Sequence, residues 1–170
     1  NIPSDAKALY CLGNLWYDKK QYEDAMICWE KAIVVAPSFP TVYRNLAIAV
    51  YNKRKQPGAA LDLFEKAFRC DTSDARVLME LDQLYKRMNK PASWRLDKLK
   101  RCSSLVQQRD DLYLEVVSLE NFSGNYEFAY QLLMVRKFHP WEGGEGKVSG
   151  QYVYSLTELA KQDISNGAFG

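Results

Sequence analysis

A residue pattern that returns every 34 or 35 positions constrains the fold of this chain more than any other feature. The first copy orders large apolar residues, small residues and a proline, and the second copy largely keeps that order. The first copy comprises Leu9, Leu12, Gly13, Trp16, Ala25, Trp29, Ala32 and Pro37, and the second comprises Tyr43, Leu46, Ala47, Val50, Ala60, Phe64, Ala67 and Thr72. Weaker copies begin near Leu78 and Tyr113. A period of this length indicates one supersecondary unit repeated along the chain.

Each copy contains two stretches in which apolar residues are three or four positions apart, the spacing of one helix face. In the first copy these stretches predict helices over about 5–19 and 22–35. Where Gly13 of the first helix faces Ala25 of the second, small side chains let the helices approach closely. One hairpin cannot bury both of its apolar faces, so successive hairpins must stack, and about three or more are needed for a stable core.

The pattern resembles the tetratricopeptide repeat family, whose unit carries a large residue, Leu-Gly and an aromatic, and later Ala, an aromatic, Ala and Pro. The first copy matches best. The second matches well, with one extra residue in its internal turn at 53–58, where Pro57 is placed to start a helix. We therefore predict an all-α fold, a right-handed superhelical stack of antiparallel helix hairpins with about four repeats and a C-terminal helix. We expect a single domain over 1–170, with repeats at about 5–38, 39–73, 74–108 and 109–136, an inserted loop at 137–148 and a partial fifth repeat at 149–170.

The third and fourth copies depart from the pattern at the positions where helices should approach most closely. Asp82 and Val117 replace the small residue of the first helix. Arg95 and Arg136 stand where a small residue is expected in the second helix. Because protein interiors are close-packed, we expect looser or rotated packing in these two hairpins.

The composition excludes several classes of function. The 23 basic and 21 acidic side chains leave a net charge of +2, which gives no electrostatic attraction toward nucleic acid or membrane. No apolar run reaches the roughly 18 residues of a membrane span. The four cysteines, Cys11, Cys28, Cys70 and Cys102, form no CxxC pair, and we expect buried small hydrophobic residues rather than disulfides or metal ligands. Unpaired cysteines favour a cytoplasmic location without fixing the compartment.

Two segments invite a catalytic interpretation, and neither has the pattern that the chemistry requires. The glycine-rich stretch 143–147 lacks the first Gly of a Walker-type loop, since Trp141 stands there, and Val148 replaces the required Ser or Thr. His139 is the only histidine and has no nucleophile signature beside it. We therefore predict that the chain is not an enzyme and holds no cofactor and no metal.

The segment 137–148 is nevertheless unusual, because it inserts about nine residues between adjacent hairpins. It either packs against the stack as a structural plug or contacts a ligand directly. Its candidate residues are Phe138, His139, Trp141 and Glu142. The stretch also resembles one in the helical C-terminal part of large, mostly bacterial proteins, where a β-sandwich module of carbohydrate-related role precedes tetratricopeptide-type repeats. That resemblance implies a partner module upstream in the same chain.

The C-terminal remainder has the spacing of a first helix over about 152–160, followed by a turn that resembles the turn at 124–126. A helix without its hairpin partner exposes an apolar stripe. We therefore expect that residues 1–170 are a segment of a longer protein.

Ligand-contacting residues are expected on the first helices of the hairpins, which line the concave surface of such a stack. Tyrosine and arginine are enriched at binding hot spots, although the same residues are also found on ordinary solvated helix faces. The candidates are Lys7, Tyr10, Asn14, Tyr17, Arg44, Asn45, Ile48, Tyr51, Arg76, Met79 and Gln83, with Thr41, Asn52, Glu80 and Arg87 beside them.

One subclass of the family binds the C-terminal carboxylate of chaperone tails with two asparagines and three basic residues. The resemblance places Asn14 and Asn45 on the asparagine positions and Arg76 on one basic position. Tyr10 and Glu80 occupy the other two basic positions. The lost positive charges and the added negative charge remove the charge-assisted bonds that recognise a carboxylate, so we do not expect such a clamp.

We therefore expect a non-catalytic tetratricopeptide-like scaffold for contact with a protein, a peptide or an upstream domain of its own chain. In this interpretation Tyr10, Tyr17, Arg44 and Tyr51 share one exposed concave face. The alternative is an accessory helical segment of a carbohydrate-active enzyme, whose 137–148 loop reaches the active site of a module outside this chain. A third interpretation is self-association through the helix of the fifth repeat.

Overall fold

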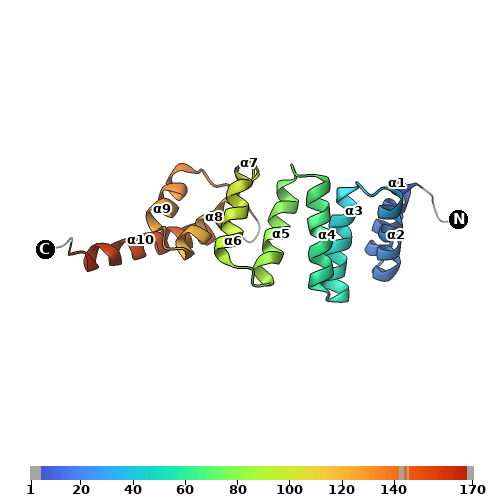
Figure 1. Ribbon diagram of the computed structural model, residues 1–170, viewed down its shortest axis with the longest axis horizontal. Helices are drawn as coiled ribbons and strands as arrows, with labels where there is room; N and C mark the ends of the chain where they lie inside the picture. The colour runs from blue at the N-terminus through green and yellow to red at the C-terminus, as the bar shows by residue number, and fades with distance from the viewer. Residues whose placement is uncertain (1–4, 142–143, 145, 168–170) are drawn as a thin grey trace. The chain divides into compact units, whose positions relative to one another are not determined.

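The computed structural model describes residues 5–141, 144 and 146–167, which are all-α and contain no strand (Figure 1). In chain order the elements are α1 (Ala6–Asp18), α2 (Tyr22–Val35), α3 (Pro40–Ala49), the π-helix η1 (Val50–Arg54), α4 (Pro57–Cys70), α5 (Ala75–Arg87), α6 (Ala92–Arg101), α7 (Ser103–Val106), α8 (Asp110–Phe122), α9 (Tyr126–Val135) and α10 (Lys147–Ser165). The predicted all-α class is confirmed. The chain divides into two compact units, 1–88 (unit 1) and 89–170 (unit 2). The single domain over 1–170 and its repeat boundaries stay predictions.

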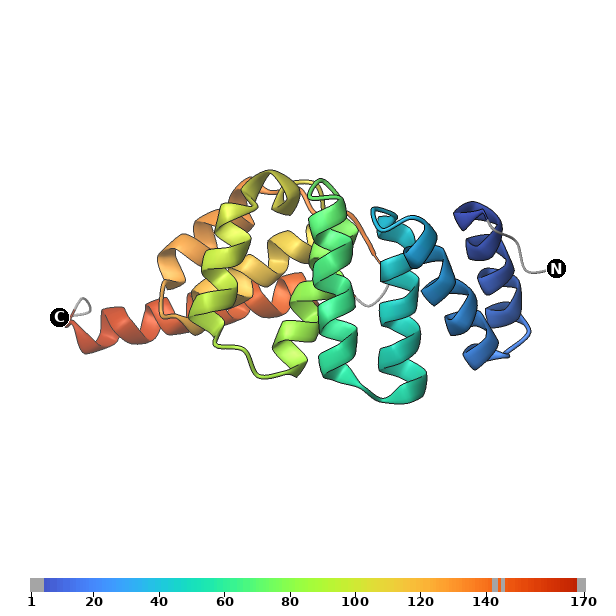
Figure 2. The same cartoon turned by 45° about the vertical axis from the view of Figure 1, so that its right-hand side comes forward.

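Unit 1 is built from helix hairpins. α1 packs against α2, α3 packs against α4, and α5 packs on α4, so that α1 to α5 lie side by side in chain order (Figures 1 and 2). α1 and α2 begin and end within one residue of the predicted bounds. The repeated pattern supplies most of the core, which includes Leu9, Ala25, Trp29, Ala32, Leu46, Ala47, Ala60 and Phe64.

A close contact of the first hairpin joins Gly13 to Trp29. A Cβ atom on Gly13 would lie 2.4 Å from Trp29 Nε1 and 2.5 Å from Trp29 Cδ1. The indole is almost fully buried and its Nε1 donates a hydrogen bond to the backbone oxygen of Tyr10, at 3.3 Å. The sequence predicts that Gly13 faces the small Ala25, but the atoms nearest to the glycine belong to Trp29. Gly13 therefore makes room for a large ring.

The second hairpin accommodates its extra residue at the end of its first helix. The last turn of α3 widens into the π-helix Val50–Arg54, and the chain then reverses at Lys55, whose φ is 56°. Pro57 occupies the first turn of α4, as predicted. A π-turn holds one more residue than an α-turn and is often found at functional sites. Tyr51 and Asn52 both lie within η1.

A residue in the left-handed conformation lies shortly after each of α1, η1, α5 and α8. Lys20, Lys55, Asn89 and Gly124 have φ values of 62°, 56°, 56° and 83°. They recur at intervals of 34 or 35 positions, the period of the sequence pattern. This conformation ends helices efficiently, but it strains residues with a side chain. The backbone conformation therefore repeats with the same period as the sequence. Three of the four left-handed positions are occupied by residues other than glycine.

Unit 2 contains the hairpin of α8 and α9, and α10 packs against both helices. A buried polar network joins α10 to α8, because Asn121 Nδ2 donates to Gln151 Oε1 at 2.9 Å and Ser155 Oγ donates to Asn121 Oδ1 at 2.9 Å. Buried polar groups need partners, so this network fixes the register of α10 on α8. The helix predicted for the C-terminal remainder is confirmed, although it spans Lys147–Ser165 rather than about 152–160. Its residues Val153 and Ile164 are exposed, in agreement with the expected apolar stripe.

Two predictions about individual residues are wrong. Arg136 does not lie in the second helix of the fourth hairpin, because α9 ends at Val135 and Arg136 is extended. The cysteines are free, but Cys11 and Cys70 are exposed and Cys102 is half-buried, so only Cys28 is the buried residue that we expect of all four. Asp82 and Arg95 are both buried, in unit 1 and unit 2 respectively. The looser packing of the third and fourth hairpins stays a prediction.

Candidate functional site

The first helices of unit 1 are joined by a network of polar side chains. Asn45 on α3 lies near its centre, and its Nδ2 donates to Asn14 Oδ1 at 3.3 Å and to the Tyr10 hydroxyl at 3.4 Å. Asn14 and Tyr10 both belong to α1. The Tyr10 ring packs on Phe39, with ring centroids 5.3 Å apart. The amide of Asn45 thus connects the first two hairpins on a face that is only partly buried.

An ion pair continues this network from α3 to α5. Arg44 donates to Glu80 through two nitrogens, from Nε to Oε2 at 2.7 Å and from Nη2 to Oε1 at 2.5 Å. Arg44 Nη1 also donates to Asn45 Oδ1 at 3.5 Å, and Arg76 Nε lies 3.4 Å from Glu80 Oε1. The side chains of Arg44 and Glu80 are 15% and 19% exposed. A bidentate pair with this degree of burial orients both side chains firmly.

Two hollows open on the same helices. The Tyr51 hollow has a volume of about 280 Å³ and is lined by Ile48, Tyr51, Asn52, Phe64, Met79, Glu80, Gln83, Leu84 and Arg87. The Tyr17 hollow has a volume of about 350 Å³ and is lined by Asn14, Tyr17, Asp18, Trp29, Asn45 and Ile48. Ile48 lines both, so the hollows are neighbours along α3. We call the two hollows and the polar network together the groove face.

The two hollows differ in chemistry. Phe64, Leu84 and Met79 make the Tyr51 hollow apolar, and the Arg87 guanidinium lies over the Tyr51 ring, 5.5 Å from its centroid. Such a cation over an aromatic face is attracted by the ring quadrupole. Asn14 and Asn45, by contrast, bring amide groups to the Tyr17 hollow. The groove face therefore offers apolar volume at one position and hydrogen-bonding groups at the next.

Most of the residues predicted for ligand contact are brought together here. Of the predicted set, ten residues lie in the network or line a hollow: Tyr10, Asn14, Tyr17, Arg44, Asn45, Ile48, Tyr51, Arg76, Met79 and Gln83. Lys7 is exposed on α1. The sequence did not predict that Phe64 and Leu84 line the Tyr51 hollow or that Trp29 lines the Tyr17 hollow. Their helical spacing is typical of core residues, so they were not candidates for ligand contact. Whether this set binds a partner stays a prediction.

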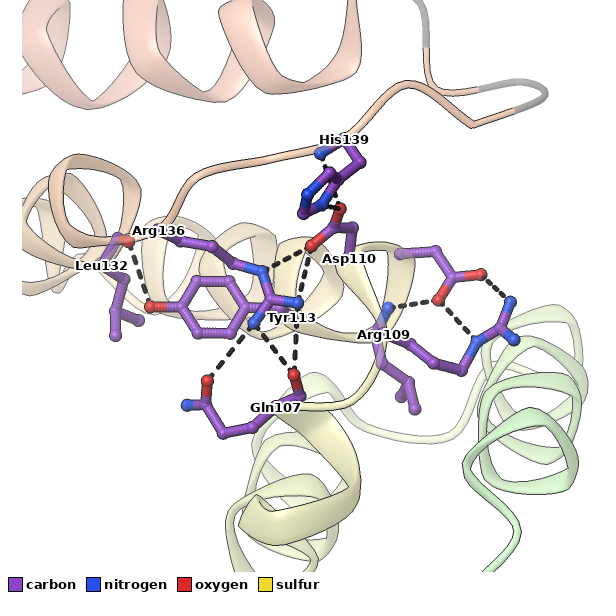
Figure 3. A network of polar contacts seen from close by, with 9 residues as sticks. Gln107, Arg109, Asp110, Tyr113, Leu132, Arg136 and His139 are labelled. Atoms are coloured by element: carbon purple, nitrogen blue, oxygen red, sulfur yellow. Dashed lines mark hydrogen bonds and ion pairs between the residues drawn. The ribbon is translucent and has the colours of Figure 1, made fainter.

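The loop after α9 is anchored to unit 2 by Asp110. Asp110 accepts from Arg136 Nε at 2.6 Å and from the His139 backbone N–H at 2.8 Å, while His139 Nδ1 lies 3.3 Å away (Figure 3). Arg136 also lies over the Tyr113 ring, 4.4 Å from its centroid. Burial opposes ionisation of Asp110, but the His139 N–H and Arg136 outweigh it, and its pKa lies below its ordinary value. The histidine is thus held by its backbone, and its ring is 78% exposed.

A third hollow of about 230 Å³ lies within this loop, and we call it the loop hollow. It is lined by Phe138, His139, Pro140, Trp141, Gly144 and Val148. Phe138 packs on Tyr113, with ring centroids 5.9 Å apart, and Trp141 packs against Gly144, where a Cβ would lie 2.4 Å from the indole. Of the predicted loop residues, Glu142 lies outside the described residues. The packing of Phe138 fits the interpretation of a plug, and the hollow leaves direct ligand contact open.

Two further properties of the described residues bear on partners. No group of three or more His, Cys, Asp or Glu side chains lies close enough there to hold a metal ion. No helix in the described part of the chain combines the length and the apolar character that crossing a lipid bilayer requires.

The sequence is similar to known repeat proteins. Residues 13–54 match the family described as TPR repeat, the abbreviation for tetratricopeptide repeat. Over 85 residues, 50% of this chain, the sequence is 33% identical to the TPR repeat-containing thioredoxin TTL4 of Arabidopsis thaliana. That match covers 12% of the length of the plant protein.

Solved structures share the fold at low sequence identity. MamA has a TM-score of 0.61 at 16% identity, covering 95% of this chain and 82% of its own. YrrB, described as a TPR protein with an unusual peptide-binding site, has a TM-score of 0.67 at 18% identity, covering 95% and 86%. The first TPR of Spaghetti (RPAP3), bound to the HSP90 peptide SRMEEVD, has a TM-score of 0.58 at 18% identity, covering 72% and 97%. These similarities support the helical-repeat fold for this chain.

Proposed function

We propose that this chain is a non-catalytic scaffold that binds a peptide or an extended segment of a partner protein on the groove face of unit 1. The observation that carries the proposal is the pair of neighbouring hollows, which share Ile48 and are lined mainly by residues of α1, α3, η1 and α5. An extended segment presents alternating side chains and main-chain amides. Apolar volume beside Tyr51 and amides at Asn14 and Asn45 match both kinds of group.

The relatives supply independent support. TPR proteins act as protein-interaction scaffolds, and two of the structures with this fold are described with a peptide-binding site or a bound peptide. At 18% identity they support only the class of ligand, and the residues of this chain decide which ligand fits. A partner in the same chain, such as an upstream module, satisfies the same chemistry as a separate protein.

A peptide-display selection against the purified chain tests the proposal. Peptides that bind should lose at least tenfold in affinity when Tyr51→Ala or Met79→Ala removes a wall of the Tyr51 hollow. Tyr154→Ala and Met134→Ala are matched controls, because they remove the same side chains from exposed positions in unit 2. Equal losses in the controls, or a selection that yields no binder, would contradict the proposal.

A second candidate function rests on the loop hollow. Phe138 and Trp141 present aromatic rings beside the exposed His139 ring, and such surfaces suit sugar rings as well as proline. In this interpretation the chain is the accessory helical part of a larger, bacterial carbohydrate-active protein. A glycan array on the wild-type chain and on Trp141→Ala separates the two candidates. Sugar binding that is lost in Trp141→Ala favours the second candidate. If neither chain binds any glycan on the array, the scaffold function is favoured.

A further inference from the structure

The starting observation is that each of the three guanidinium nitrogens of Arg44 donates a hydrogen bond within the protein. Its Nε and Nη2 both donate to the Glu80 carboxylate, and its Nη1 donates to Asn45. Nε and one Nη form the edge of the fork that binds a carboxylate in bidentate geometry. Glu80 therefore already holds the place that the carboxylate of a bound ligand would take on Arg44.

The surroundings of Glu80 are those of an anion site. Arg76 Nε lies 3.4 Å from Glu80 Oε1, so two guanidinium groups converge on one carboxylate. The Asn45 amide lies next to Arg44 and reaches Asn14. Without Glu80, this arrangement would present two cations and two amides on a partly buried surface, which favours an incoming anion.

Glu80 also lines the Tyr51 hollow, together with Met79 and Gln83. A peptide that ended in this hollow would bring its terminal carboxylate close to the carboxylate of Glu80. Like charges at short range repel, and Arg44, which would bind such a carboxylate in bidentate geometry, is already paired with Glu80. Arg87 also lines the hollow, where its guanidinium lies over the Tyr51 ring. A segment that passes through the hollow carries no such charge and meets no such opposition.

We propose that Glu80 is a specificity-determining residue that fills the Arg44–Arg76 anion site from within, so that the groove face selects internal peptide segments over C-terminal carboxylates. This inference rests on the proposed function of the groove face. It assigns to one side chain the choice between two ways of binding a partner. It also predicts that carboxylate recognition is latent in the site.

The test uses the peptide SRMEEVD and the same peptide with a C-terminal amide, with affinities measured by fluorescence anisotropy. The wild-type chain should bind the free carboxylate less than twofold more tightly than the amide, or should bind neither form measurably. The variant Glu80→Gln should bind the free carboxylate at least tenfold more tightly than the amide. Adding Arg44→Gln to that variant should abolish the preference.

Glu23→Gln is the matched control. Glu23 accepts from Arg54 Nη2 at 2.8 Å and from Arg54 Nε at 3.2 Å, so the substitution also removes a carboxylate from a bidentate arginine pair in unit 1, outside the groove face. It should leave the preference unchanged. Circular dichroism establishes that each variant is folded, and Glu80→Ala tests the same point if Glu80→Gln fails to fold.

Two results would overturn the inference: a tenfold carboxylate preference in the wild-type chain, or folded Glu80 variants without any preference. Failure of the proposed function is a different result. If peptide display yields no binder while Glu80→Gln gains the carboxylate preference, the function is wrong and the anion site is right. If display yields binders whose affinity depends on a free C-terminal carboxylate, the function is right and the role of Glu80 is wrong.

Discussion

The contact between Gly13 and Trp29 predicts that Gly13→Ala is one of the most destabilising small substitutions in unit 1. The added Cβ would lie 2.4 Å from Trp29 Nε1, 2.5 Å from Cδ1 and 3.0 Å from Cε2, and no real Cβ is found that close to a neighbour. The indole cannot simply move aside, since Trp29 is 2% exposed and its ring packs on Tyr17 at 5.6 Å between centroids. The ring must shift, or the hairpin must open.

Inserting one carbon into a well-packed core costs about 1–3 kcal/mol. Losing the hydrogen bond from Trp29 to the Tyr10 backbone adds about 1 kcal/mol. These two losses sum to about 2–4 kcal/mol, and the gain of up to about 1 kcal/mol from replacing a helical glycine by alanine opposes them. We therefore expect Gly13→Ala to lower the free energy of unfolding by about 1–3 kcal/mol, or Tm by about 2–12 °C for a chain of this size.

Thermal and urea unfolding, followed by circular dichroism, measure the effect. Gly58→Ala is the control, because Gly58 lies in the first turn of α4 and a Cβ there would have nothing within 4 Å. It should leave stability unchanged or raise it by up to about 1 kcal/mol. A Gly13→Ala variant as stable as Gly58→Ala would refute the reasoning, because it would mean that the indole has room to yield.

Four further substitutions test other parts of the structure. Lys20→Gly and Lys55→Gly should each raise the free energy of unfolding by about 0.5–1 kcal/mol in urea titrations, because both residues have positive φ; unchanged stability would count against strain there. Asp74→Ala should lower it by about 1 kcal/mol, since the side chain caps α5 by accepting from the backbone N–H groups of Arg76 and Val77, and a neutral result would contradict that role. Asp110→Asn should lower it by about 1–2 kcal/mol and speed hydrogen exchange at His139. Because the pKa of Asp110 is lowered, its contribution is complete above about pH 4 and is lost as pH falls through the folded pKa, so the variant should lack that loss on the acid side.

The helices were predictable because one period fixes many residues at once. Leu9, Trp29 and Ala32 recur with the spacing of two helix faces, and α1 and α2 end where that spacing ends. The face of the candidate site was predictable for the same reason, since first-helix positions outside the core pattern must point away from it. Tyr17 and Tyr51 line hollows on that face.

Contacts that depend on the exact placement of one side chain were not predictable. A local pattern shows that Gly13 needs space, but it does not reveal that the ring of Trp29 fills it. One extra residue near 53–58 can be accommodated either by a longer turn between the helices or by a wider last turn of the first helix. Only the backbone hydrogen bonds show that the chain forms the wider turn, η1. Arg136 continues the helical spacing of α9, yet its backbone is extended and its side chain pairs with Asp110.

The ion pair of Arg44 and Glu80 shows the same limit at long range. The two residues are 36 positions apart, close to one period, so they lie at similar places on successive first helices. The sequence therefore places both on the groove face. It does not show that the two side chains form an ion pair with each other. In our proposal this ion pair determines which ligand the groove face can bind.

Hydrogen exchange measured by mass spectrometry, with and without a peptide selected by display, tests most directly whether the groove face of unit 1 is the binding surface. Binding should slow exchange in α1, α3, η1 and α5, which carry most of the lining of the two hollows, more than in α2 or in α9 and α10 of unit 2. Protection concentrated in α9, α10 or the segment 136–141, with the first helices of unit 1 unchanged, would contradict the proposed binding surface.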